Sequence, residues 1–314
     1  MDRFVFMIIQ EDSKLPRIGV LMINYNQWEL TGNCVESLLR STGVSVVIGL
    51  VDNNSTAEAP DWVKNTPEIS FYRSSTNSGF IAGNIRAFEM VILRDVDFVI
   101  LLNNDTEVEP DMLSILAAHF TSHPDTGLAT PVISYAENRQ IIWHAGGKFL
   151  PRKMGVRQLF NTLTDLPDDS VEVDQISGCA MIMRPDLFKA IGYQDPDLFI
   201  YHEDVEQSLK SREMGFKNYL VPAARMIHYV SITVGGVLSP FAVYFTHRNR
   251  YIFASRNLKG MNLFVFRCYY FAVTLAKTII YPLKHCANLV YWMWLAVFHA
   301  VRNRPDNKPE GLFL

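Results

Sequence analysis

The first half of the chain alternates short, mainly apolar runs with stretches of helical periodicity. The runs cover Ile18–Ile23, Val46–Val51, Ile69–Tyr72 and Phe98–Leu102. Residues 30–39 and 79–93 carry apolar side chains at helical spacing. Strands that alternate with helical crossovers are typical of parallel sheets. The pattern predicts an α/β domain with a mostly parallel sheet, in which Pro110 suits the first turn of the helix after the fourth strand.

Polar residues follow three of these predicted strands. Asn24 and Asp52 come directly after the first two, and Asp105 follows the fourth at the end of Asn103-Asn104-Asp105. Open α/β sheets bind ligands outside the carboxyl ends of their strands, so one crevice would collect all three side chains. Asn and Asp also begin turns, which explains any one of them equally well. The three together favour a site.

The last third of the chain is basic and apolar. No Asp or Glu occurs from residue 214 to residue 305. Within it, Leu263–Tyr281 and Leu283–Val301 are each close to the roughly 20 residues of a spanning helix. Arg267 and Lys277 lie inside the first segment, and charges within hydrocarbon are costly. We therefore expect amphipathic helices in the membrane interface; a helical subdomain covering the sheet, or a dimer interface, is the alternative.

Composition narrows the function. With 49% hydrophobic and 19% charged residues among 314, the chain is expected to fold. Its net charge of -3 argues against nucleic acid as the main partner. Four cysteines without CxxC spacing favour a reducing compartment. The apolar stretch before Gln10 is too short for an export signal and predicts a lead-in to the first strand.

The fourth strand ends in a candidate metal ligand. Leu101 and Leu102 run into Asn103-Asn104-Asp105, which would present a carboxylate at the strand tip. Mg²⁺ and Mn²⁺ take oxygen ligands and bridge carboxylates to the phosphates of nucleotide sugars. The same residues also suit a simple turn.

As an ordered set, the motifs of this chain resemble the inverting family-2 glycosyltransferases of the GT-A fold. The matching segments are Ile23-Asn24-Tyr25-Asn26, Val51-Asp52-Asn53-Asn54-Ser55, Asn77-Ser78-Gly79-Phe80-Ile81-Ala82-Gly83-Asn84, Leu102-Asn103-Asn104-Asp105, Ser177-Gly178-Cys179-Ala180, Tyr201-His202-Glu203-Asp204-Val205-Glu206, His228-Tyr229-Val230-Ser231, Tyr244 and Arg248-Asn249. The resemblance covers residues 17–257. Within the family, the chain looks most similar to the rhamnosyltransferase-like and galactofuranosyltransferase-like branch.

The resemblance implies a nucleotide site in the first half of the chain. Asp52 would accept the N3 hydrogen of uracil or thymine, and Asn24 and Asn54 would belong to the same pocket. Gly79 would let the backbone approach the donor, and Asn84 would hydrogen-bond nearby. A turn and cap at the start of a helix is the alternative for the last two, and it is compatible with a nucleotide nearby.

The resemblance also implies a Mn²⁺ or Mg²⁺ site. Asp105 matches the last acid of the family's DxD motif, and Asn103 replaces the first. His228 matches a histidine that completes the metal site in some members. Imidazole suits Mn²⁺ better than Mg²⁺. Taken alone, one histidine is more often structural.

The catalytic base is expected where Glu203-Asp204 opens a helix-like stretch. The second acid of Glu203-Asp204 matches the family's general base, so Asp204 would deprotonate the acceptor hydroxyl, with Glu203 in support. Both acids would also be favoured simply by a helix N-terminus.

Four further residues are candidates for the acceptor or the diphosphate. Trp143 and Gly178 stand in loops suited to a sugar ring, although a packed hairpin explains the first equally well. Arg248 and Asn249 would bind a diphosphate or the phosphate of a lipid-linked acceptor, or lie on a solvated helix face.

These expectations combine into one hypothesis. Residues 1–257 would form the GT-A domain and residues 258–314 a membrane-associating unit. The enzyme would move a sugar from a UDP- or dTDP-sugar to a lipid-linked saccharide, with inversion, at the cytoplasmic face of the membrane, and an oligomer is compatible with this. A non-catalytic nucleotide-sugar-binding subunit and a nucleotidyltransferase are the alternatives.

Overall fold

The computed structural model describes residues 14–192, 198–230, 238–302, 309 and 312. The lead-in expected before the first strand falls mostly outside these residues. The strands are β1 (Arg17–Asn24), β2 (Ser45–Asp52), β3 (Ile69–Arg73), β4 (Phe98–Leu102), β5 (Thr106–Val108), β6 (Thr126–Tyr135), β7 (Ile142–His144), β8 (Gly147–Leu150), β9 (Gly155–Gln158), β10 (Val171–Val173), β11 (Ala180–Met183) and β12 (Lys217–His228).

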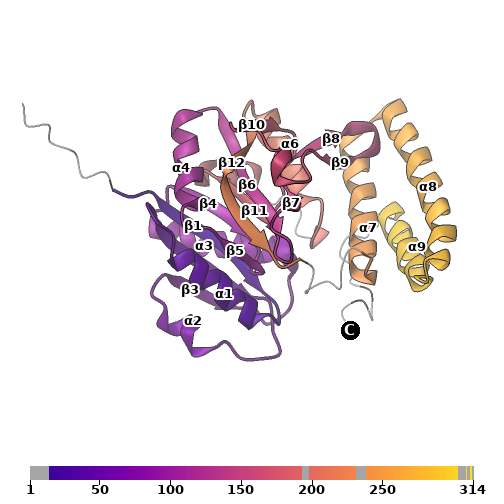
Figure 1. Cartoon of the computed structure of the whole chain (residues 1–314). Coiled ribbons are helices and arrows are strands. Elements are labelled where there is room, and N and C mark those ends of the chain that lie inside the picture. The colour runs from indigo at the N-terminus through magenta and orange to yellow at the C-terminus, as the bar shows by residue number, and fades with distance from the viewer. Residues whose placement is uncertain (1–13, 193–197, 231–237, 303–308, 310–311, 313–314) are drawn as a thin grey trace, which may run out of the picture.

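Helices flank these strands (Figure 1). They are α1 (Trp28–Leu39), α2 (Asp61–Asn65), α3 (Gly79–Val91), α4 (Met112–Ser122), α5 (Pro185–Ile191), α6 (Glu203–Glu213), α7 (Pro240–Asn257), α8 (Gly260–Leu283) and α9 (Asn288–Val301), with short 3₁₀ turns η1 (Ile92–Arg94), η2 (Pro151–Lys153) and η3 (Leu163–Asp165).

Ten of the described strands form one mixed, mostly parallel sheet. Its order is β10-β12-β6-β11-β4-β1-β2-β3, with β5 added beside β12 and β7 beside β6. The strands β1, β2, β3 and β4 are mutually parallel, whereas β11 runs antiparallel to both β4 and β6. The remaining two, β8 and β9, form a separate hairpin. The α/β sheet predicted from the apolar runs is confirmed.

Alternate residues of the central strands supply two cores, one on each face of the sheet. On β1, Ile18, Val20 and Met22 join the cluster that α1 and α4 cover, and Leu21 joins the cluster on the face of α3 and α5. This two-residue period is the pleat of a strand buried on both faces. Gly49 on β2 lets α3 pack closely, because a Cβ there would lie 2.6 Å from the backbone oxygen of Ala87.

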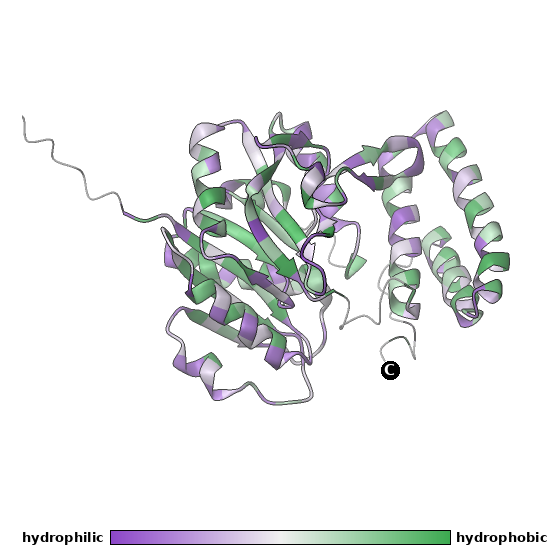
Figure 2. Cartoon of the chain, viewed as in Figure 1, coloured by the Kyte–Doolittle hydropathy of each residue, from purple (hydrophilic) through white to green (hydrophobic). Residues whose placement is uncertain are grey.

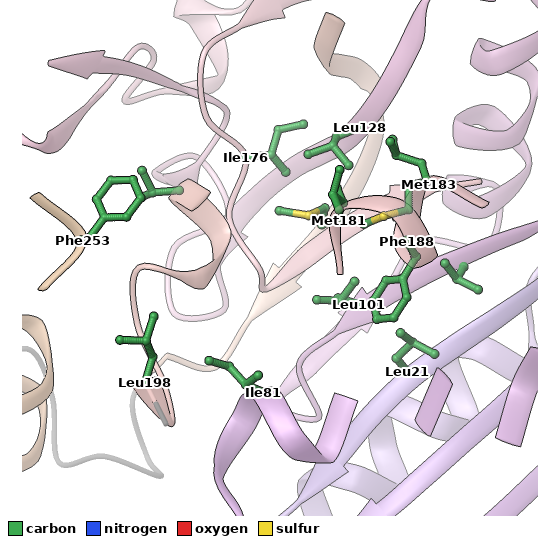
Figure 3. Packing of buried hydrophobic residues seen from close by; sticks show 14 of the residues in the cluster. Leu21, Ile81, Leu101, Leu128, Ile176, Met181, Met183, Phe188, Leu198 and Phe253 are labelled. Carbon is green, nitrogen blue, oxygen red and sulfur yellow. The ribbon is translucent and has the colours of Figure 1, made fainter. Parts of the chain in front are cut away.

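The C-terminal helices share a core with the sheet. Figure 3 shows the same apolar cluster extending from Leu21 and Phe188 at the sheet to Leu198 and then to Phe253 on α7. Figure 1 shows α7, α8 and α9 grouped beyond the β8–β9 hairpin. Apolar side chains are exposed along α8 and α9, and the ribbons of these two helices are largely hydrophobic in Figure 2. The boundary after residue 257 stays a prediction.

One local expectation was wrong. Pro110 does not lie in the first turn of a helix, since α4 begins at Met112. Its carbonyl instead accepts a hydrogen bond of 2.8 Å from the backbone N–H of Thr42, which fixes it in the turn before α4.

Candidate active site

Asn24 and Asp52 lie side by side at the carboxyl ends of β1 and β2. The parallel register pairs the two residues, and Asn24 Nδ2 donates to Asp52 Oδ1 over 3.0 Å. Ser55 Oγ also donates to Asp52 Oδ1. Arg73 Nε lies 3.4 Å from Asp52 Oδ2, and this buried oxygen accepts no hydrogen bond from the described residues. Oδ2 is thus ion-paired with Arg73 but is still able to accept a hydrogen bond from a ligand N–H.

The start of α3 adjoins this pocket. Asn53 Nδ2 donates to the Gly79 carbonyl over 2.9 Å, which ties the end of β2 to α3. Gly79 has a φ of 86° and packs against the Phe199 ring, which a Cβ would meet at 2.5 Å. Asn84 is buried and donates to the carbonyl of Phe80 in its own helix over 2.9 Å. Asn54, two residues after Asp52, is exposed and has a φ of 68°.

Pairing of two strands that are distant in sequence joins Asp105 to His228. Residue 105 immediately precedes β5, which runs antiparallel to the end of β12, where Thr106 is opposite His228. His228 Nε2 lies 3.1 Å from Asp105 Oδ1. The Trp143 ring stands edge-on to the imidazole with 4.4 Å between ring centroids. All three predicted residues therefore meet at the sheet edge.

This pair fits part of the coordination sphere of a divalent cation. Burial disfavours a charge on His228, but Cys179 and Asp105 outweigh it and raise the pKa of the imidazole when no cation is bound. Only the neutral ring is a metal ligand, so a cation that binds here would displace the proton. Within the described part of the chain, no group of three or more His, Cys, Asp or Glu side chains forms a metal site. Mg²⁺-type sites commonly combine one or two carboxylates with phosphate and water oxygens. Asp105 and His228 suit that arrangement.

Asn103 enters the site region mainly through its backbone. Its N–H donates to the Cys179 carbonyl over 3.0 Å, and its carbonyl accepts from Thr106 Oγ1 over 2.7 Å. Its half-buried side chain makes no hydrogen bond with the described residues. The role of its amide as a metal ligand stays a prediction.

Glu203 and Asp204 form the first turn of α6, as expected. Asp204 Oδ2 accepts from Gln175 Nε2 over 3.0 Å, and Oδ1 accepts from the Val205 N–H over 2.8 Å. Gly178 packs on both acids, because its Cβ would lie 3.6 Å from Asp204 Cβ and from Glu203 Oε1. Burial raises the pKa of both carboxyl groups, and the charge of Asp204 raises that of Glu203 further.

The segment before β11 connects the carboxylates of α6 to the Asp105–His228 pair. Gly178 lies against Asp204, and the next residue, Cys179, interacts with His228. Ala180 then pairs with Leu102 at the end of β4. Asp204 and His228 thus lie on the same edge of the sheet.

The loop before α6 is strained and tightly held. Phe199, Tyr201 and His202 all have φ between 67° and 71°, a left-handed conformation that costs non-glycine residues about 1–3 kcal/mol each. Such strain persists only where surrounding contacts hold it. Here they fix the backbone that leads into Glu203 and Asp204.

Arg248 and Asn249 supply those contacts. Asn249 Nδ2 lies 2.9 Å from the carbonyl of Leu198, 2.6 Å from that of Ile200 and 3.1 Å from that of Tyr201. Arg248 Nη2 donates to the Leu198 carbonyl over 3.0 Å. Both side chains are buried, so the alternative of a solvated helix face is wrong. Their proposed contact with a diphosphate stays a prediction.

A cleft of about 460 Å³ opens beside Asp204. It lies between α6, the β8–β9 hairpin, α7 and α8, and its volume is within the range of roughly 300–1,000 Å³ that holds small ligands. Glu203 does not line it. Of the two acids, Asp204 is the one that faces a space for a substrate.

Family comparison agrees with this geometry. The model of "Glycosyl transferase family 2" matches residues 19–210, which include the strand ends and the start of α6. The chain belongs to this family.

Curated relatives of this family-2 glycosyltransferase are named as sugar transferases. The "Low-salt glycan biosynthesis hexosyltransferase Agl10" of Haloferax volcanii is 24% identical, over 77% of this chain and 76% of its own length. The "N-acetylglucosaminyl-diphospho-decaprenol L-rhamnosyltransferase" of Mycobacterium tuberculosis is 25% identical, over 77% and 85% respectively.

Solved structures show that the family-2 chain has the GT-A fold. The mannosyltransferase PcManGT of Pyrobaculum calidifontis, in complex with GDP-Man and Mn²⁺, aligns with a TM-score of 0.55 and 14% identity over 93% of this chain and 89% of that one. GalNAc-T7 with UDP, GalNAc and Mn²⁺ aligns with a TM-score of 0.55 and 19% identity over 69% of this chain, but over only 44% of its own.

Several side chains of the site were missed by reasoning from sequence. Ser55 and Arg73 contact Asp52, Asn53 holds α3, and Gln175 bonds to Asp204. Ser55 and Asn53 stand in the motif around Asp52 and had a local signal. Arg73 and Gln175 depend on strand register and on a distant segment, for which the sequence carries no local pattern.

Proposed function

We propose that this family-2 glycosyltransferase transfers a sugar, rhamnose-like or another hexose, from a UDP- or dTDP-sugar to a hydroxyl of a lipid-linked saccharide, with inversion. The observation that carries the proposal is the position of Asp204. Its carboxylate borders a cleft on one side and is linked through Gly178 and Cys179 to His228 and Asp105 on the other. A base and a diphosphate-binding pair on either side of one reaction centre are what a single displacement requires.

Asp204 is the proposed general base. Its raised pKa gives it a greater proton affinity than a solvated carboxylate while it remains partly ionised near neutrality. Gln175 and the N-terminus of α6 hold its oxygens in place. It would take the proton from the acceptor hydroxyl as that oxygen attacks the anomeric carbon opposite the diphosphate. Inversion of the anomeric configuration follows from one such attack.

Asp52 and Asp105 would bind different parts of the donor. The unbonded Oδ2 of Asp52 would accept the N3 hydrogen of a uracil or thymine, while Asn24 and Ser55 hold its other oxygen. Asp105 and His228 would hold Mn²⁺ or Mg²⁺ against the diphosphate. The bound ion supplies positive charge that stabilises the leaving group.

The acceptor would enter from the side of the C-terminal helices. One helix of the described chain, Gly260–Leu283, has the length and composition of a membrane-crossing helix, and most of it is not buried. Arg267 is exposed on it, and Lys277 is half-buried. We propose that α8 and α9, as the unit from residue 258 onward, lie on the cytoplasmic face of the membrane, where a lipid-linked acceptor is presented.

A panel of nucleotide sugars with Mn²⁺ or Mg²⁺ tests the function. UDP- or dTDP-sugars are expected to raise the melting temperature in a metal-dependent way, to be slowly hydrolysed, and to give a product of inverted anomeric configuration when an acceptor is present.

Asp52→Asn should weaken nucleotide binding about tenfold or more, because it loses a charged hydrogen bond. His228→Ala should remove the metal dependence.

The same panel separates the two alternatives. Nucleotide-sugar binding without any hydrolysis would favour a non-catalytic assembly subunit. Release of diphosphate from a nucleoside triphosphate would favour a nucleotidyltransferase.

A further inference from the structure

Two cations line the same cleft as Asp204. Lys153 ends η2, before the β9 strand, and Arg250 lies on the cleft-facing side of α7. Arg250 Nε donates to the Lys153 carbonyl over 2.9 Å. The Tyr269 ring of α8 also lines the cleft, with its centroid 5.8 Å from Lys153 Nζ and 5.6 Å from Arg250 Cζ. Three separate elements thus bring these side chains to one cleft.

Neither cation has an acidic partner. Among the described residues, no carboxylate lies within ion-pair distance of Lys153 or Arg250. Asp204, the acid that lines the same cleft, is bonded to Gln175 and to its own helix. Burial and the charge of Arg250 lower the pKa of His202 to about 4, so this neighbour is neutral. Two like charges held together gain most from an anion between them.

We infer that Lys153, Arg250 and Tyr269 bind the phosphate or diphosphate group that joins the acceptor saccharide to its lipid. The inference rests on the proposed function, since it names the part of the acceptor that this end of the cleft recognises. It differs from the sequence-based expectation, which assigned such a group to Arg248. Arg248 is turned inward and buried, whereas Arg250 faces the cleft.

The groups that line the cleft match the parts of such an acceptor. Asp204, where the reacting hydroxyl would lie, shares the cleft with Lys153 and Arg250. The helix α8, which contributes Tyr269 to the cleft, exposes Phe264 and Val265 about one turn away along the helix. A sugar, a phosphate and an apolar chain would each find a suitable environment here. Arginine and lysine are the usual ligands of phosphate oxygens.

Binding of farnesyl diphosphate, measured by calorimetry on the full chain with saturating nucleotide, tests the inference without turnover. Lys153→Gln removes an exposed cation and should weaken binding about tenfold. Thr246→Glu adds a carboxylate at an exposed cleft position and should weaken it at least as much. Arg157→Gln removes a cation from the same hairpin outside the cleft and should change nothing. Farnesol and inorganic pyrophosphate should each bind much more weakly than farnesyl diphosphate.

Three results would overturn the inference. Equal binding of farnesyl diphosphate to wild type, Lys153→Gln and Thr246→Glu would exclude this site. Equal binding of farnesol would show that only the chain is recognised, and equal binding of pyrophosphate would exclude a lipid-linked source. Because no transfer is measured, an enzyme inactive with every sugar donor would contradict the proposed function and leave this result intact.

Discussion

The two adjacent carboxyl groups of α6 have different surroundings. Asp204 has a hydrogen-bond donor for each oxygen and faces the cleft. Glu203 is buried, and its Oε2 accepts no hydrogen bond from the described residues. Desolvation favours the neutral form of a carboxyl group, and a neighbouring carboxylate adds to this. Glu203 is therefore suited to hold a proton, and Asp204 to accept one.

Glu203→Gln should reduce the loss of stability at high pH. Burial, and then the charge of Asp204, raise the pKa of Glu203 in the folded chain above its ordinary value. Between those two pKa values the folded state binds more protons than the unfolded state, so stability falls as pH rises. Glutamine does not titrate. The melting temperature of wild type should fall from about pH 5 to about pH 8. For the variant, this fall should be smaller by about 2–4 °C.

The matched control for this prediction is Glu213→Gln at the exposed far end of α6, which should behave like wild type. Differential scanning calorimetry at both pH values measures the shift. An identical pH dependence in Glu203→Gln and wild type would contradict the assignment.

Among the residues of the site, the sequence was most informative for those that directly follow a strand, because the end of the strand fixes where the side chain lies. Asn24 and Asp52 follow consecutive parallel strands, so their contact follows from the register. The contact between Asp105 and His228 requires β5 to pair with β12 across more than a hundred residues. No local pattern encodes that pairing, and the family resemblance supplied it.

At the scale of elements, α7 positions the loop that leads into the base. Asn249→Ala removes the amide shared by three loop carbonyls, which should cost about 2–4 kcal/mol of stability because those carbonyls stay buried. We also expect a tenfold or larger fall in kcat with little change in nucleotide Kd, since small displacements of catalytic groups are costly.

Asn257→Ala on the same helix is the control, because Asn257 donates only to the carbonyl of Phe253 in its own helix. It should retain wild-type kcat. A purely structural role for Asn249 would lower stability without lowering the kcat of the folded enzyme at low temperature, and steady-state kinetics would reveal this.

The first four strands and the C-terminal helices α8 and α9 were predicted closely, whereas the strands after β4 were not. The strands β1, β2, β3 and β4 are short apolar runs joined by helices, and all their pairings are parallel: β1, β2 and β3 pair in chain order, and β4 returns to pair with β1. The central strands β6, β11 and β12 pair across long intervals and in mixed directions. Periodicity locates an apolar strand but does not identify its partner.

At the scale of the whole molecule, the catalytic domain and the apolar helices form one continuous body. The shared core through Leu198 and Phe253 keeps α7 close to the loop before α6 (Figure 3), while apolar residues of α8 are exposed. Such a patch on a basic surface is typical of membrane binding.

Phe264→Glu combined with Ile279→Glu should weaken binding to phosphatidylglycerol vesicles about tenfold or more, because both exposed side chains would otherwise insert beside the headgroups. Cosedimentation measures the effect, and added salt should weaken wild-type binding as well. Leu93→Glu alters an exposed apolar residue on η1, away from these helices, and should have no effect. Equal vesicle binding by wild type and the double variant would show that this face of α8 does not bind the membrane.

The most direct test is the rate of sugar transfer by Asp204→Asn, measured together with its nucleotide Kd on the same preparation. Loss of the base should lower transfer by about a hundredfold or more, while Asp52 and Asp105 keep nucleotide binding at its wild-type value. A variant that transfers sugar at the wild-type rate would contradict the account, because its central carboxylate would then have no part in the reaction.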